Sequence, residues 1–333
     1  MSGTEGATAL LKNVEVESSV GRVPPARKTG LSLFLSRLVK QRTLVFMSVP
    51  FILWLFLFKY VPLWGWTIAF QNFKPAKSFG EQQWVGWKQF EFMFADDRFL
   101  QVMRNTLAMS LINFVLGFAT AITLAILLNE LRAVAFKRFV QTISYLPHFI
   151  SWVVAATIIQ TALSTDGGIV NEVLLALGLI QEPVLWLGVG KYFWGIMGVS
   201  EVWKNVGWNT IIYLAALTTI DPSQYEAAEI DGAGRFQRIW HITLPGIRPV
   251  IVILMIINLG QILETGFEPQ YLLGNGPNLD YSENLEIFIL KYGMNLGNYS
   301  LSVAAGIFKT IVSIVLLFGA NHLAKRMGQD RLF

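Results

Sequence analysis

The sequence contains no cysteine, and only 14% of its 333 residues are charged. The absence of cysteine excludes disulfide bonds and zinc sites built on thiolates. No GxxxxGK[ST] phosphate loop occurs, so we expect this chain to bind no nucleotide and no other cofactor. Its three histidines are isolated, and His148 has no second ligand three or four residues away. We therefore expect neither a metal site nor the active site of a membrane enzyme.

Apolar residues are abundant instead. They make up 53% of the chain, and the mean hydropathy is +0.50. They form long blocks, and neither Asn105–Asn129 nor Phe139–Thr165 contains a charged residue. A helix needs about 20 mostly apolar residues to cross the hydrocarbon core of a bilayer. The sequence therefore predicts an all-α integral membrane protein with one membrane domain.

Six membrane-spanning helices are predicted. They cover roughly Leu44–Ile68, Asn105–Leu128, Phe139–Leu163, Tyr192–Thr219, Pro249–Leu263 and Ser302–Leu323. The membrane domain is placed at residues 44–324. Before it we expect a tail of residues 1–43 with an interfacial helix around Leu31–Leu38, and after it a tail of residues 325–333. His148 is expected to form a hydrogen bond to another helix, and Pro147 to mark a kink or an end.

Positive charge is unevenly distributed among the loops. Lysine and arginine are enriched in both tails and in the loops after the second and fourth spans, as in Arg132 and Arg238. Cytoplasmic loops carry the excess of these residues, so we expect both termini and the loop after the fourth span on the cytoplasmic side. The net charge of +4 follows this topology, and no nucleic-acid partner is expected.

The loop after the fourth span, residues 221–248, is a polar segment between two long apolar runs. Asp221 suits a helix N-cap and Pro222 the first helical position, so a short helix is expected through Tyr225–Ile230. The glycines Gly232 and Gly234 should interrupt this helix and allow a sharp turn.

A second short helix is predicted after the glycines. Its apolar face comprises Phe236, Ile239, Trp240, Thr243 and Leu244, which recur at helical spacing. Pro245 and Pro249 should mark the return to the membrane, because proline lacks a backbone donor. The two helices would form either a compact docking surface or a solvated loop with an ordinary apolar underside.

This loop resembles the EAA motif of permease subunits in binding-protein-dependent ABC importers, which reads EAA, three residues, G, nine residues, then I-x-L-P. The matching residues are Glu226, Ala227, Ala228, Asp231, Gly232, Ala233, Gly234, Ile242, Leu244 and Pro245. Further segments resemble the branch that imports oligosaccharides and polysaccharides, namely Tyr60–Pro75, Trp84–Phe94 and Tyr299–Lys309.

The resemblance implies a type I ABC importer permease fold, similar to that of the maltose transporter, in a bacterial inner membrane. It assigns ATPase coupling to the motif residues and to the adjacent Tyr225 and Arg235. The implied partners are a second and usually different permease, two ATPase subunits that hold ATP and Mg²⁺, and an extracytoplasmic solute-binding protein that delivers a sugar. Transport would proceed by alternating access. A homodimer remains open, and no residue identifies the sugar.

Polar residues inside the fourth and fifth spans are candidates for the sugar path. Sugars bind to aromatic faces and hydrogen-bonding side chains, and the resemblance places the path in the spans that flank the loop. The candidates are Asn205, Trp208, Asn209, Gln261, Glu264 and Thr265. Equally, such residues can join helices to one another. Glu201 and Lys204 are three residues apart and could pair, and Lys309 could pair with a neighbouring carboxylate.

The alternative function is a secondary transporter or channel that works without an ATPase. It predicts an internal repeat with broken helices in both halves. No convincing self-similarity is visible in the sequence, which favours the ABC permease.

Overall fold

The computed structural model of the chain describes residues 40–326. The predicted interfacial helix and most of both tails lie outside these residues. The chain divides into two compact units, Met1–Trp64 and Gly65–Phe333. The described part of the first unit is helical, with α2 (Arg42–Leu55) followed by a π-helical turn, Phe56–Tyr60, and the start of the 3₁₀ segment Val61–Phe70. No residue of α2 is buried in the chain, although its sequence is strongly apolar.

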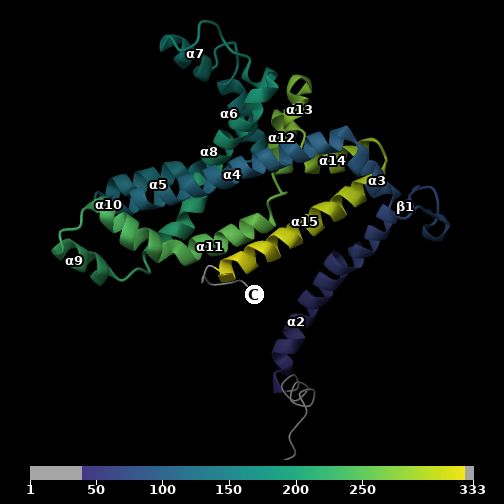
Figure 1. The fold of residues 1–333 in the computed structure, drawn as a ribbon, viewed down its shortest axis with the longest axis horizontal. Coiled ribbons are helices and arrows are strands. Elements are labelled where there is room, and N and C mark those ends of the chain that lie inside the picture. Colours follow the sequence, from purple (N-terminus) through teal and green to yellow (C-terminus); the bar gives the residue numbers. More distant parts are fainter. Residues whose placement is uncertain (1–39, 327–333) are drawn as a thin grey trace, which may run out of the picture. The chain divides into compact units, whose positions relative to one another are not determined.

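The second unit is built mainly of helices (Figure 1). Its long helices are α4 (Asp97–Glu130), α8 (Phe193–Leu217), α11 (Leu244–Gly260) and α15 (Tyr299–Arg326). Its shorter helices are α3 (Lys88–Ala95), α5 (Val134–Phe149), α6 (Trp152–Ala162), α7 (Ile169–Ala176), α9 (Pro222–Ile230), α10 (Arg235–Arg238), α12 (Phe267–Leu273), α13 (Leu279–Ser282) and α14 (Leu285–Leu290). Two short strands, β1 (Gln71–Asn72) and β2 (Gln83–Trp84), pair antiparallel with Gln71 opposite Trp84.

Four helical stretches in the described part of the chain are long and apolar enough to cross a membrane. They are Arg42–Phe70, Asp97–Glu130, Arg235–Gly260 and Tyr299–Arg326, and the bent pair of α5 and α6 makes a fifth if it counts as one span. The protein is thus a helical, multi-pass membrane protein. The predicted fourth span is helical as α8, but it is not among these stretches, and polar residues such as Lys204 and Asn209 occupy its middle.

The predicted third span is broken shortly after Pro147, where a kink or an end was expected. Helices α5 and α6 meet at 107°. Ile150 and Ser151 have extended backbone between them, and the Ser151 side chain accepts a hydrogen bond from the Val154 N–H as the N-cap of α6. The new helix therefore has its own start signal. Pro147 lies inside α5, one turn before the break.

The predicted fifth span also differs. The second helix of the loop does not end before the membrane, because Arg235–Gly260 is one continuous helical stretch. Pro245 lies at the start of α11, directly after a π-helical turn, Ile239–Thr243. A wider turn at this point tolerates the missing proline donor. At its other end the helix stops at Gly260, earlier than the predicted Leu263.

Two apolar clusters hold α4 and α8 together at separate levels. One contains Met109 of α4 and Met197 of α8, and the other contains Ala121 of α4 and Tyr213 of α8. Between these levels both helices present polar residues. The packing therefore leaves a polar layer in the middle of the helix pair, which is where the candidate site lies.

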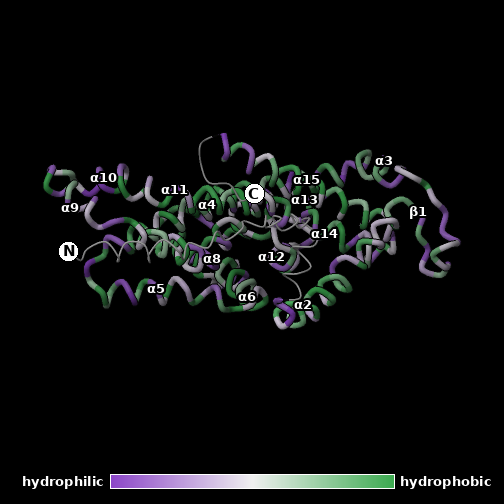
Figure 2. The backbone as a smooth tube through the Cα atoms, turned by 90° about the horizontal axis from the view of Figure 1, so that it is seen from below, coloured by the Kyte–Doolittle hydropathy of each residue, from purple (hydrophilic) through white to green (hydrophobic). Residues whose placement is uncertain are grey.

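Polar and apolar residues are separated along the second unit. Helices α9 and α10 lie at one end of this unit, and α3 and β1 lie at the other (Figure 1). Hydrophilic residues gather in the loops at both ends, whereas the helices between them are mostly hydrophobic (Figure 2). This distribution is the one expected of a unit that is embedded in lipid along its middle.

Candidate functional site

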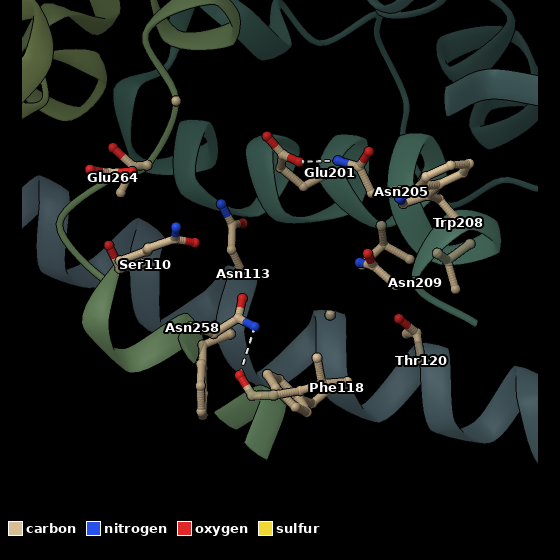
Figure 3. Close-up of a pocket in the computed structure, with 18 of the residues that line it drawn as sticks. Ser110, Asn113, Phe118, Thr120, Glu201, Asn205, Trp208, Asn209, Asn258 and Glu264 are labelled. Carbon is tan, nitrogen blue, oxygen red and sulfur yellow. Dashed lines mark hydrogen bonds between the residues drawn. The ribbon is translucent and has the colours of Figure 1, made fainter. Parts of the chain in front are cut away.

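A cavity of about 550 Å³ lies between α4, α8, α11 and the break that joins α5 to α6. Figure 3 shows polar side chains from α4, α8 and α11 around this space. Its volume falls within the range of about 300–1,000 Å³ that is typical of small-molecule sites.

All six residues of the predicted sugar path line this single cavity. Three come from α8 and three from the segment directly after α11: Asn205, Trp208, Asn209, Gln261, Glu264 and Thr265. They are not equally available, because Thr265 is 5% exposed and its hydroxyl accepts a hydrogen bond of 2.7 Å from the Asn284 amide. Glu264 and Gln261 are exposed.

Gln261, Glu264 and Thr265 lie beyond the end of the helix, although the fifth span was predicted to extend to Leu263. Helix α11 ends at Gly260, and the segment 261–266 is non-helical. It closes on Gly266, which has a φ of +84°. Backbone without helical hydrogen bonds is tolerated in membrane proteins where it lines a cavity rather than lipid, and this segment does so.

The sequence predictions missed the wall contributed by α4. Ser110, Asn113 and Thr120 of this helix also line the cavity, and Figure 3 shows Asn113 between Glu201 of α8 and Asn258 of α11. Its Oδ1 atom is buried and has no hydrogen-bond partner. Single small polar residues in an apolar helix more often join helices, so no sequence signal separated these three from structural residues.

A chain of contacts runs along the α8 side of the cavity. The Asn205 amide donates to Glu201 Oε2 at 2.6 Å, and its Oδ1 lies 3.0 Å from Nδ1 of His148. The predicted hydrogen bond from His148 to another helix is thus confirmed. The His148 ring also stacks on Trp208, with centroids 4.5 Å apart and planes at 6°. Together they form a flat surface, and Trp208 remains 45% exposed.

Lys204 does not form the predicted ion pair with Glu201. Its Nζ donates instead to the backbone oxygens of Pro147, His148 and Ile150, at 3.3, 3.0 and 2.7 Å. These carbonyls belong to the end of α5, where the break leaves them without helical partners. Lys204 is 5% exposed and is not among the residues that line the cavity, so its charge caps the broken helix.

Lys309 of α15 pairs with carboxylates, as predicted. Its Nζ lies 2.8 Å from Glu286 and 3.5 Å from Glu264. This arrangement neutralises part of the negative charge at the cavity residue Glu264. Lys309 itself does not line the cavity.

The loop 221–248 begins as predicted. Asp221 caps α9 through a 2.9 Å hydrogen bond from the Ser223 N–H, and this backbone bond holds the pKa of Asp221 below its usual value. Gly232 has a φ of +77°, and the Ala233 N–H bonds to the Ala228 carbonyl at 2.8 Å. This pattern is a Schellman motif, which ends the helix at a glycine in the left-handed conformation.

The second half of the loop is attached to α9 by polar contacts. Tyr225 and Thr243 lie 3.0 Å apart through their hydroxyls, and Arg238 pairs with Glu229 at 3.5 Å. Gly234 is the N-cap of α10, and its N–H bonds to Gln237 Oε1 at 2.7 Å. The residues matched to the motif therefore lie on α9, the turn after it, the π-helical turn Ile239–Thr243 and the start of α11.

The apolar face of this second helix is only partly buried on the chain, because Thr243 is buried and Ile239 and Leu244 are half-buried. Phe236 is 88% exposed and Trp240 70%, and Ile230 at the end of α9 is 87% exposed. Glu226 is exposed too, and it has no ion-pair partner in the described part of the chain.

Comparison with known proteins gives one family and a set of full-length relatives. The family described as "Binding-protein-dependent transport system inner membrane component" matches residues 113–329. A polygalacturonan/rhamnogalacturonan transport system permease protein of Bacillus subtilis is 39% identical over 97% of this chain and 100% of its own length. A lactose transport system permease protein of Rhizobium radiobacter is 31% identical over 67% of this chain and 74% of its own.

A solved structure is similar over most of the chain. It is a bacterial ABC transporter involved in the import of the acidic polysaccharide alginate, and its matching chain has a TM-score of 0.81 at 36% identity. The match covers 88% of this chain and 99% of the other. A second structure of a bacterial alginate ABC transporter, in complex with an alginate pentasaccharide-bound periplasmic protein, gives a TM-score of 0.82 at 35% identity.

Proposed function

We propose, from the premise that the chain belongs to the family of binding-protein-dependent transport system inner membrane components, that it forms half of the membrane path of an ATP-driven sugar importer. The resemblance stated from the EAA motif is confirmed by this family match. The relatives are transport permeases, and the chain is a permease subunit rather than an enzyme. The sugar, the partners and the coupling that follow are parts of the proposal.

The observation that carries the proposal is the coincidence of a polar cavity and an exposed coupling loop in one chain. The cavity has a stacked aromatic surface, His148 on Trp208, and carboxylate and amide groups around it. Such a surface binds the face of a sugar ring, while the polar groups bind its hydroxyls. The relatives named for polygalacturonan, rhamnogalacturonan and lactose support a sugar as cargo, and we propose an oligosaccharide.

The loop 221–248 is proposed to dock on a cytoplasmic ATPase subunit. Ile230, Phe236 and Trp240 expose apolar surface on one loop, and exposed apolar patches mark interaction sites. The unpaired Glu226 offers a charge that fixes orientation across an interface. Because Arg235–Gly260 is one helical stretch, a movement of the docked loop would pass directly to the cavity residues at its far end. This rigid connection supports alternating access.

The proposed topology has six spans with both termini in the cytoplasm. It counts α8 as a span whose polar middle faces the path, and α5 with α6 as a broken one. The partners are a second permease that completes the path, two ATPase subunits and an extracytoplasmic binding protein. The apolar and unburied α2 is suited to lipid and to the second permease. The location would be a bacterial inner membrane.

Replacing Glu226 with lysine tests the proposal. The chain is expressed with its second permease and ATPase subunits, and the ATPase retained on the purified membrane complex is measured together with sugar uptake. We expect Glu226→Lys to weaken retention by roughly tenfold or more, because a like-charge contact costs several kcal/mol at an interface. Gln224→Lys also places a lysine on α9, outside the motif, and should retain the ATPase.

Unchanged retention and unchanged uptake in Glu226→Lys would overturn the docking role of the loop. Sugar uptake that persists when no ATPase copurifies with the wild-type chain would instead favour the secondary transporter.

A further inference from the structure

The charged groups around the cavity bear on whether the sugar is uncharged or carries a carboxylate. Glu201 and Glu264 line it, and no lysine or arginine does so among the residues that the structure describes. The chain does contain basic residues close by. What matters is therefore whether those cations are free to meet a substrate.

Both nearby lysines are engaged elsewhere. Lys204 lies on α8 between the cavity residues Glu201 and Asn205, but its ammonium group binds three backbone oxygens at the end of α5 and the side chain is 5% exposed. Lys309 is shared between Glu264 and Glu286. Neither lysine can turn to an anionic ligand without breaking these contacts.

The groups that do face the cavity are mainly hydrogen-bond acceptors or uncharged amides. The carboxyl groups of Glu201 and Glu264 present oxygens to the cavity, and the buried Asn113 Oδ1 is an acceptor without a partner. Sugar hydroxyls are donors that suit such acceptors. The carboxylate of a uronic acid is an acceptor and an anion, so it would meet the partial negative charge left on Glu264 beside Lys309. It would find no free lysine or arginine among the described residues of this wall.

From this arrangement we infer that the sugar residue which passes the wall built by this chain is uncharged, stacks on the His148–Trp208 surface and donates its hydroxyls to Glu201, Glu264 and Asn113. The inference rests on the proposed function and specifies the class of its substrate. An acidic unit in the cargo would have to contact groups outside the cavity wall of this chain.

Saturation-transfer NMR on the complex in nanodiscs tests the inference. The complex, with its second permease and ATPase subunits, is offered trigalacturonate and its carboxyl-reduced counterpart, which differ only at C6. We expect the neutral trisaccharide to bind roughly tenfold more tightly, since opposed like charges suppress the wrong ligand. Equal or tighter binding of trigalacturonate overturns the inference, and so does the absence of signal from both.

Isosteric variants show which residues cause the preference for the neutral trisaccharide. Glu201→Gln and Glu264→Gln remove one charge each and should move the binding ratio several-fold towards trigalacturonate. Glu268→Gln is the matched control, because Glu268 is exposed and lies outside the cavity, and it should leave the ratio unchanged. A ratio that stays the same in both cavity variants overturns the inference.

The same preparation separates this inference from the proposed function. A complex that retains its ATPase but prefers trigalacturonate overturns only the uncharged substrate. A wild-type chain that retains no ATPase contradicts the importer itself.

Discussion

In the loop 221–248, the large apolar residues Phe236 and Trp240 are exposed, and single polar contacts such as Tyr225 with Thr243 hold the two halves together. Around the cavity the pattern is reversed. Lys204 is buried with three hydrogen bonds, and α8 approaches α5 so closely that a Cβ on Gly207 would overlap the backbone of Ser144.

The difference indicates which contacts stabilise each region. The frame of the cavity is fixed by contacts inside the chain, so changes there should cost folding stability. The loop keeps apolar surface that contacts inside the chain do not satisfy, so changes there should cost attachment to a partner and leave the fold intact. The predictions below test this contrast.

The largest effect is expected at Gly207. The Gly207→Ala methyl group would meet the Ser144 carbonyl, which is backbone and cannot move independently. We expect a loss of about 3 kcal/mol in folding stability, as in severe overpacking, measured by thermal unfolding in detergent. Gly195→Ala on the same helix meets nothing within 4 Å and is the control. Equal melting temperatures for the two variants would contradict the close crossing of α5 and α8.

Lys204→Met should have the next largest effect. It keeps the length of the side chain but leaves three carbonyls at the end of α5 without their charged donor. Hydrogen bonds to charged groups contribute about 1.5–3 kcal/mol, so we expect a destabilisation of about 2 kcal/mol and faster amide exchange at the start of α6. Lys191→Met, at an exposed position, should change neither measurement. Slow exchange in Lys204→Met would show that the break does not depend on this cap.

Gly232→Ala tests the loop. Alanine at a φ of +77° costs about 1 kcal/mol, which should reduce ATPase retention roughly fivefold while thermal unfolding of the membrane helices stays unchanged. Gly234 also matches the motif, but its φ is −69°, and a Cβ there meets only Gln237 Oε1 at 3.7 Å. Gly234→Ala should therefore be mild. Equal loss in both variants would mean that the ATPase, not backbone strain, excludes a side chain.

The smallest effect concerns the cap of α9. The pKa of Asp221 is lowered from 3.8, first by the backbone bond from Ser223. A lowered pKa means that the stabilisation is present above the usual value and is lost as pH falls through the native one. Amide protection in the first turn of α9 should therefore decrease as pH falls below about 4, measured by hydrogen exchange and corrected for the intrinsic rate. Asp221→Asn keeps a cap without titrating and should show no such decrease.

Local signals allowed the loop to be predicted well up to its turn. Asp221 and Pro222 are start signals whose physics depends on neighbouring residues alone, and Gly232 is a stop signal of the same kind. The prediction was wrong at Pro245, where a helix was expected to end. Proline interrupts the usual hydrogen-bond pattern, but a π-helical turn before it tolerates the missing donor, and periodicity does not reveal such a turn.

The cavity was predicted only in part. Trp208 and Asn209 could be selected because polar residues in an apolar span are costly and usually functional. Asn113 could not, because a single amide in α4 has the same appearance whether it faces a cavity or a neighbouring helix. At the break between α5 and α6 the carbonyls bind Lys204, which is more than fifty residues away. The segment Phe139–Leu163 does not show this contact, and it was predicted as one span.

The sequence by itself determined the membrane class, the polar loop with its cap and turn, and the types of residue available to meet a sugar, because these follow from hydropathy and from interactions between near neighbours. Only the tertiary structure decided which polar groups face one cavity, where the third span breaks and which apolar residues stay exposed. Lys204 and Lys309 show the reason. What a buried charge contributes depends on the groups that it contacts, and the groups that these two lysines contact lie on other helical segments.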